Sequence, residues 1–251
     1  MAEGRVGTSG WSYPEWIGRF YPAGTSTPRM LPFYARRFRT VELHSTYRNL
    51  PSPAAIERWK SSVAADFRFA PKAHLGITHR RDLTGIEDRV TAFLTAVAPL
   101  APNLGPVLIA LPHQAVDLER LDRLLAALPR PTEGSGFHFA FQLHAGWLVP
   151  GVLDRLEAHG STLVIVEAEG PPPRPLQVGS FTYVRLRRDR YTRAELHAWG
   201  ARMADDVAAG RDAYLFLKHD EVADGPRYAR QVSTKLGAPV PEQSELDPTD
   251  A

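Results

Sequence analysis

The sequence of 251 residues contains no cysteine, which excludes a thiol nucleophile, a cysteine-ligated metal site and a disulfide. The amino-terminal residues contain no apolar stretch of signal-peptide length, and the longest aliphatic runs, residues 107–111 and 163–166, are far shorter than a membrane span. We therefore predict a soluble cytoplasmic protein that does not enter membranes. Its chemistry must come mainly from carboxylate, histidine, hydroxyl and lysine side chains.

Lysine is also scarce, because only four of the 30 basic residues are lysines and the rest are arginines. The 28 acidic residues leave a formal net charge of +2. Arginine stays charged and binds phosphate or carboxylate with two donors, so this composition suits an anionic ligand. A codon bias toward arginine explains the same numbers, and composition alone does not separate the two explanations.

Short β-branched or aromatic runs recur along the chain and predict eight strands. They cover residues 5–8, 40–43, 67–70, 106–111, 138–143, 162–167, 181–186 and 213–217. Most are followed by apolar residues at spacings of three and four, which predict helices over 87–100, 117–128, 192–209 and 225–236. Eight strand–helix repeats in about 240 residues predict a (β/α)8 TIM-type barrel, with a doubly wound open sheet as the alternative.

Two segments depart from this repeat. Residues 168–180 hold four prolines and exclude a normal helix, so we predict that the helix after strand six is missing or replaced by a proline-rich loop. The last residues, from 238 on, carry three prolines and four acidic residues with little to bury. We predict one barrel domain over residues 1–237 and a loose tail over 238–251.

The carboxyl ends of barrel strands form the active face, and here they are rich in polar residues. Glu42 and His44 are two residues apart on one strand and so share a face, as do Arg185 and Arg187. A glutamate inside a barrel needs a cationic partner, for which Lys72 on the next strand is the natural candidate. Such a pair suits proton transfer, and it equally suits a structural ion pair.

The segment Gly7-Thr8-Ser9-Gly10 is of the kind that turns successive backbone N–H groups toward an anion. Ser9 as a nucleophile is a weaker idea than Ser9 as a turn residue, because the nucleophile-elbow motif is absent. No cofactor is predicted. A divalent metal has one plausible but minor ligand set, gathered from separate strands: His44, His144, Glu167 and His219.

Six segments closely resemble the YecE-like family, also described as domain of unknown function 72. They are residues 6–22 (VGTSGWSYPEWIGRFYP), 40–52 (TVELHSTYRNLPS), 67–79 (FRFAPKAHLGITH), 104–112 (LGPVLIALP), 183–186 (YVRL) and 215–229 (LFLKHDEVADGPRYA). The resemblance implies a TIM-type barrel of unestablished activity, distantly similar to sugar isomerase and apurinic endonuclease barrels, with nucleic-acid binding as a suggestion. The recurring polar positions of the family fall on Thr8, Ser9, Gly10, Trp11, Glu42, Thr46, Tyr47, Lys72, Thr78, His79 and Arg185.

The sequence departs from the family pattern at four places. Strand four ends in Ala110-Leu111-Pro112-His113 where Gln-Leu-Pro-Pro is usual. His44 stands where the family usually has asparagine, and Arg187-Arg188 stand where His-Gly is common. Strand five lacks the usual Glu-Phe-Arg-His and offers Gln142 and His144 instead. Relative to the family pattern, the strand-five change removes a carboxylate and an arginine from the predicted pocket, and Arg187-Arg188 make the end of strand seven more basic.

Three functions remain open from the sequence, together with the oligomeric state. The leading one is an enzyme that acts on a small molecule bearing phosphate or carboxylate through Glu/Lys acid–base chemistry. The second is a nucleic-acid-binding barrel that grips the backbone with Arg185, Arg187, Arg188 and Arg190. The third is a metal-dependent hydrolase or lyase. The predicted catalytic residues are Glu42, Lys72, His44 and His79, and the predicted substrate-binding residues are Thr8, Ser9, Gly10, Trp11, Thr46, Tyr47, His144, Arg185, Arg187, Lys218 and His219.

Overall fold

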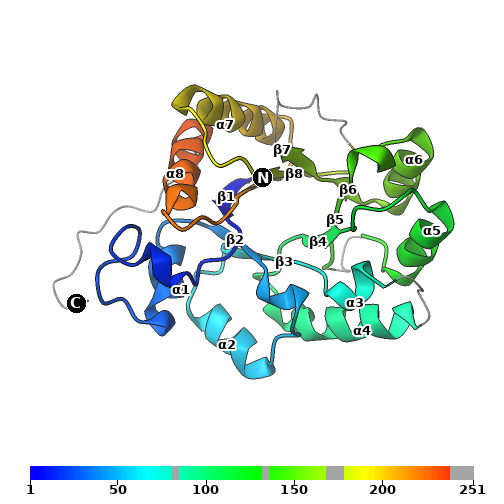
Figure 1. Cartoon of the computed structure of the whole chain (residues 1–251), viewed down its shortest axis with the longest axis horizontal. Coiled ribbons are helices and arrows are strands. Elements are labelled where there is room, and N and C mark those ends of the chain that lie inside the picture. Colours follow the sequence, from blue (N-terminus) through cyan, green and yellow to red (C-terminus); the bar gives the residue numbers. More distant parts are fainter. Residues whose placement is uncertain (81–84, 132–135, 168–177, 238–251) are drawn as a thin grey trace.

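Short parallel strands alternate with helices along the chain, and the helices surround the strands (Figure 1). The computed structural model describes residues 1–80, 85–131, 136–167 and 178–237. Its strands are β1 Gly4–Thr8, β2 Thr40–Leu43, β3 Arg68–Pro71, β4 Val107–Ala110, β5 Phe139–Gln142, β6 Thr162–Leu163, β7 Ile165–Glu167, β8 Thr182–Leu186 and β9 Ala213–Leu217. Its α-helices are α1 Thr27–Ala35, α2 Pro53–Ser61, α3 Leu75–Thr78, α4 Ile86–Val97, α5 Leu118–Ala127, α6 Pro150–His159, α7 Arg193–Ala208 and α8 Asp224–Leu236.

Seven of the eight predicted strands appear within two residues of their predicted bounds, and the eighth is divided. The predicted strand over 162–167 forms two short strands, β6 and β7, on either side of Val164. The first half pairs with β5 and the second with β8, so the segment changes partner at this point. The Val164 N–H continues the contact with β5 by donating to the carbonyl of Phe141 at 2.9 Å.

All the pairs between these strands are parallel. Their hydrogen bonds define three groups with the orders β1-β9-β8-β7, β2-β3 and β4-β5-β6. Isolated parallel bridges join Ser9 to Glu42, between the β1 and β2 segments, and Lys72 to Leu108, between the β3 and β4 segments. This is an α/β fold of parallel sheets, and the carboxyl ends of its strands are brought together on one side.

Helix starts follow ordinary capping chemistry. Thr192 and Glu195 form a capping box at the start of α7, and the Asp117 side chain accepts the N–H of Arg120 at the start of α5. The apolar faces of the helices pack on the strands in one large core. A smaller apolar cluster holds side chains from the strands and their ends: Ala70, Leu108, Ala140, Val164, Phe181, Tyr183, Tyr214 and Phe216. Tyr183 links this small cluster to the polar residues described below.

Two predictions lie largely or wholly outside the described residues: the missing helix after strand six, at 168–177, and the loose tail at 238–251. The division into one domain and a tail therefore stays a prediction. Among the helices in the described ranges, we find none with both the length and the apolar character needed to cross a membrane.

Candidate functional site

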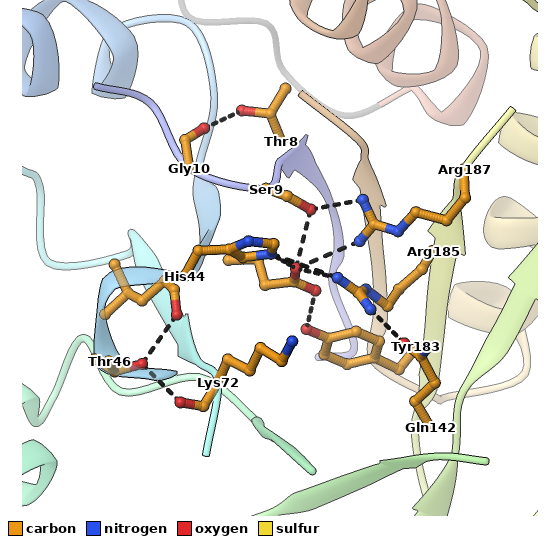
Figure 2. Close-up of polar contacts among 12 residues, drawn as sticks. Thr8, Ser9, Gly10, His44, Thr46, Lys72, Gln142, Tyr183, Arg185 and Arg187 are labelled. Carbon is orange, nitrogen blue, oxygen red and sulfur yellow. Dashed lines mark hydrogen bonds and ion pairs between the residues drawn. The ribbon is translucent and has the colours of Figure 1, made fainter. Parts of the chain in front are cut away.

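The carboxylate of Glu42 lies at the centre of a buried polar cluster and has no exposed surface. Its Oε1 atom accepts from the Ser9 hydroxyl at 2.9 Å and from Arg185 Nη2 at 2.7 Å. Its Oε2 atom accepts from the hydroxyl of Tyr183 at 2.9 Å. Figure 2 shows the side chains of Ser9, Tyr183, Arg185 and Arg187 pointing toward one another. We call these four residues with Glu42 and His44 the Glu42 cluster.

Strand periodicity delivers most of the cluster. Tyr183, Arg185 and Arg187 alternate along β8 and just beyond its end, so their side chains reach the same side. His44 lies two residues after Glu42, and its Nε2 atom is 2.6 Å from Glu42 Oε1. The shared faces predicted for Glu42 with His44 and for Arg185 with Arg187 are confirmed.

The two arginines bind the carboxylate unequally. Arg185 is nearly buried and also donates to the side-chain oxygen of Gln142. Arg187 is 3.3 Å from Glu42 Oε1, donates to Ser9 Oγ at 2.8 Å and keeps 16% of its side chain exposed. His44 is 40% exposed, so the cluster passes from a buried carboxylate to a rim that solvent reaches.

These contacts set the protonation of the cluster. Burial alone would raise the pKa of Glu42, but the charges of Arg185 and Arg187 and the bond to His44 outweigh it and hold the pKa well below its usual value. Burial raises the pKa of Tyr183 well above its usual value, and the Glu42 charge adds to the effect. Glu42 is therefore ionised at neutral pH while Tyr183 keeps its proton.

The predicted ion pair between Glu42 and Lys72 is wrong. Among the described residues the ion-pair partners of Glu42 are Arg185 and Arg187, and His44 hydrogen-bonds to it. The Lys72 ammonium instead lies 4.1 Å from the centre of the Tyr47 ring. In Figure 2 the Lys72 side chain extends toward the cluster, but no dashed line reaches its nitrogen. The physical reason is that two guanidinium groups from β8 already surround the carboxylate. Burial, and then the charge of Arg185, lower the pKa of Lys72.

Four more residues singled out in the sequence lie in the segments next to Lys72. The hydroxyl of Tyr47 is 3.3 Å from His79 Nε2, and the other ring nitrogen of His79 is 2.7 Å from the Thr78 hydroxyl. Burial, followed by the charge of Lys72, lowers the pKa of His79. The Thr46 hydroxyl donates to the carbonyl of Lys72 at 2.7 Å and so fixes the backbone from which Lys72 extends.

The backbone of the Thr8–Gly10 segment does not offer the anion site predicted for it. The N–H of Thr8 donates to the Tyr34 hydroxyl, that of Ser9 to the carbonyl of Leu217, and that of Gly10 to the carbonyl of Glu42. Each donor is therefore taken by a neighbouring segment. Only the Ser9 side chain reaches the cluster. Trp11 packs its ring on Trp59, at 5.9 Å between ring centres.

Several other predicted residues have their contacts with residues outside the Glu42 cluster. His219 stacks on Tyr13 with ring centres 4.5 Å apart, and Lys218 pairs with Asp189. His144 is exposed and lies against His113.

Glu167 binds Arg188 at 2.7 Å and accepts from the indole of Trp199 at 2.6 Å. Its carboxylate is therefore occupied. Within the described ranges no three His, Cys, Asp or Glu side chains gather as a metal site would need, so the proposed ligand set His44, His144, Glu167 and His219 is not brought together.

Sequence reasoning missed Tyr183, and it named Gln142 at the end of strand five without giving it a contact. The Tyr183 hydroxyl donates to Oε2 of Glu42, and the side-chain oxygen of Gln142 accepts from Nη1 of Arg185. The sequence did contain the information for Tyr183, because it lies two residues before Arg185 and so shares a strand face with Arg185 and Arg187. No sequence pattern indicates that Gln142, on β5, contacts Arg185 on β8.

The fold and the cluster together define an α/β protein with parallel strands, whose carboxyl ends carry a buried glutamate held by two arginines. The chain belongs to the family described as protein of unknown function DUF72, whose model matches residues 5–250. It is 37% identical to UPF0759 protein YecE of Escherichia coli strain K12 over 107 residues. That match covers 43% of this chain and 37% of YecE, so it spans little more than a third of the relative's length.

Solved structures of two DUF72 proteins share the fold. A protein from Enterococcus faecalis V583 has a TM-score of 0.78 at 18% identity, with 98% of this chain and 100% of that chain covered. One from Thermotoga maritima MSB8 has a TM-score of 0.74 at 22% identity, with 93% and 99% covered. At these identities the likeness concerns the fold alone.

Proposed function

We propose that the Glu42 cluster and Lys72 form the active site of an enzyme whose small-molecule substrate carries a phosphate or a carboxylate. The observation that carries this proposal is that Arg185 and Arg187 converge on a single carboxylate at the strand ends, while the Lys72 side chain extends toward the same cluster (Figure 2). Glu42 neutralises part of this charge, and the remainder favours an anion from outside. The partly exposed Arg187 and His44 give such a ligand a route to the cluster.

In this proposal Glu42 orients other groups and does not itself transfer protons. The sequence suggested acid–base chemistry by Glu42 with Lys72, but a carboxylate held ionised by two arginines is a weak base. His44 takes over that role. Because Glu42 is ionised, His44 Nε2 donates to it at 2.6 Å, which leaves the Nδ1 lone pair to accept a proton from substrate. Lys72, with its lowered pKa, is the second proton-transfer group.

We also propose that the parallel strands belong to a (β/α)8-type barrel. Three features support this. The first strand, β1, pairs with the last, β9. Single bridges connect the β1 segment to the β2 segment and the β3 segment to the β4 segment, and β6 is followed directly by β7. In such barrels active sites lie at the carboxyl ends of the strands, where the Glu42 cluster is found.

The nucleic-acid alternative is weaker on this geometry. Of the four arginines it needs, Arg185 and Arg187 bind Glu42, and Arg188 binds Glu167 and Glu195. Arginine side chains that are only 7% and 16% exposed, as Arg185 and Arg187 are, contact few phosphates of an extended nucleic-acid backbone. We therefore favour a small anionic ligand.

Calorimetric titration with inorganic phosphate and with acetate tests the binding part of the proposal. The wild type should bind at least one of the two anions, and Arg187→Met should weaken that binding at least tenfold. Arg123→Met is a matched control, because Arg123 is 57% exposed on α5 and pairs with Glu119. Equal binding by the wild type and Arg187→Met, or no binding of either anion, contradicts the proposal.

The catalytic part is tested with a set of phosphorylated and carboxylated small molecules in D2O. The wild type should exchange carbon-bound hydrogen for deuterium in a ligand that it binds, as followed by NMR. His44→Ala and Lys72→Met should abolish this exchange, with His44→Ala still binding the ligand. If both variants exchange at the wild-type rate, the roles assigned to the two residues are wrong.

A further inference from the structure

The Glu42 cluster and Lys72 together carry more positive than negative charge. Arg185, Arg187 and Lys72 supply three cations, while Glu42 supplies one anion. From this imbalance we infer that the anionic group of the ligand is a dianion, namely the phosphate of a phosphomonoester. The inference rests on the proposed function and narrows its substrate class, because a single carboxylate group and a phosphodiester group each carry only one negative charge.

The charge count holds when neighbouring acidic residues are included. Glu42 is the one carboxylate among the charges that act strongly on Lys72 and Arg187 within the described part of the chain. Two other acids near the strand ends that the structure describes have partners outside the cluster. Glu167 binds Arg188 and Trp199, and Asp189 binds Lys218. Within residues 1–80, 85–131, 136–167 and 178–237, two positive charges therefore remain without a counterion.

Burial and the neighbouring positive charges act in the same direction on the pKa values of these cations. Burial, and then the neighbouring Arg185 charge, lower the pKa of Arg187 to about 10. The same two causes lower the pKa of Lys72, and the charge of Lys72 in turn helps to lower the pKa of His79. Cations that are partly removed from water repel one another more strongly than exposed ones. A monoanion would offset half of the surplus, and a dianion would offset all of it.

The other usual place for a phosphate in this kind of fold is already filled. The start of the helix after the last strand often binds phosphate through its free N–H groups. Here the Asp220 carboxylate accepts from the N–H groups of Val222, Asp224 and Gly225, at 2.9, 2.8 and 2.6 Å, at the start of α8. An incoming phosphate is therefore directed to the cationic side chains.

Four small anions of different charge and similar size test the inference by calorimetry at pH 7.5. Methyl phosphate and sulfate are dianions there, while dimethyl phosphate and acetate are monoanions. We expect both dianions to bind at least tenfold more tightly than both monoanions. The second pKa of a phosphomonoester is about 6, so binding of methyl phosphate should weaken roughly tenfold between pH 7.5 and pH 5 relative to sulfate, which stays a dianion.

Lys72→Met tests whether the charge count causes the preference. This variant removes one unpaired cation without touching Glu42, so the advantage of dianions over monoanions should fall to less than threefold. Lys235→Met makes the same change at an exposed residue in the last turn of α8 and should keep the full preference. An undiminished preference in Lys72→Met contradicts the inference.

The outcomes separate this inference from the proposed function. If the wild type binds dimethyl phosphate or acetate as tightly as methyl phosphate, the dianion assignment is wrong, but the cluster still binds anions. If none of the four anions binds, both the inference and the proposed function fail.

Discussion

The Glu42 carboxylate and the Arg185 guanidinium form an ion pair at 2.7 Å in which Glu42 has no exposed surface and Arg185 has 7%. A buried pair of this kind adds little net stability, because both charges lose their hydration when the chain folds. Removing one partner is costly, since the other charge then stays buried without compensation. This asymmetry makes the pair a sensitive test of the cluster.

Glu42→Gln should lower the free energy of unfolding by about 3–5 kcal/mol, because it leaves Arg185 and Arg187 facing a neutral amide. Urea denaturation at pH 7 measures the change. Glu119→Gln on α5 removes a carboxylate that is 83% exposed and should cost less than about 1 kcal/mol. A loss below about 1 kcal/mol in Glu42→Gln would show that the cluster is open to water.

The ionisation of Glu42 should make the free energy of unfolding depend on pH in the acid range. The pKa of Glu42 in the folded protein lies well below the usual 4.5, so its ionisation stabilises the fold above pH 4.5, and this contribution disappears as the pH falls toward the folded-state pKa. The stability difference between the wild type and Glu42→Gln should therefore be largest near neutral pH and shrink below pH 4.5. Denaturation curves at pH 7, 5 and 3 measure it; a difference that grows in acid contradicts the assignment.

Much of the cluster could be predicted from local periodicity. A spacing of two residues placed Glu42 beside His44 and Arg185 beside Arg187, because side chains alternate along a strand whatever its neighbours are. The same rule, extended by one step, reaches Tyr183. Location at a strand end was a poorer guide to membership of the cluster. Glu167 and Lys218 also lie at strand ends, yet they bind Arg188 and Asp189 instead.

Long-range pairing is the part that periodicity does not contain. Lys72 and Arg185 were both possible partners for Glu42, and the choice depends on how far each side chain reaches around the sheet. Nothing in the sequence assigns a partner to the backbone N–H groups of Ser9 and Gly10. In the structure they donate to the carbonyls of Leu217 and Glu42, because β1 lies between β9 and β2. Such contacts join residues more than thirty positions apart, and a single sequence carries no local signal for them.

Lys72 provides a test that separates the predicted pairing from the observed one. Burial and the charge of Arg185 lower its pKa below the usual 10.5, whereas an ion pair with Glu42 alone would raise it. The rate of acetylation by dilute acetic anhydride, followed for the Lys72 peptide by mass spectrometry, should rise with a midpoint below pH 10.5. A midpoint above pH 10.5 would instead support the ion pair between Lys72 and Glu42 that the sequence predicted.

Gly7 brings β1 close enough to β2 for Ser9 to reach Glu42. A Cβ atom added at Gly7 would overlap the carbonyl oxygen of Thr40 and lie 2.9 Å from the Tyr34 hydroxyl. Neither neighbour has room to move, because both are buried and the Tyr34 hydroxyl already holds the N–H of Thr8. Gly7→Ala should therefore lower the free energy of unfolding by about 1–3 kcal/mol, the usual cost of overpacking.

The matched control for this substitution is Gly151→Ala in the first turn of α6, where the nearest atom to an added Cβ is the end of the Arg155 side chain at 3.6 Å. That change should be neutral or stabilising by up to about 1 kcal/mol, because alanine loses less backbone entropy than glycine in a helix. Urea denaturation of both variants measures the two effects. Because the strain in Gly7→Ala separates β1 from β2, the variant should also weaken phosphate binding, and unchanged stability together with unchanged binding would contradict the close approach of these strands.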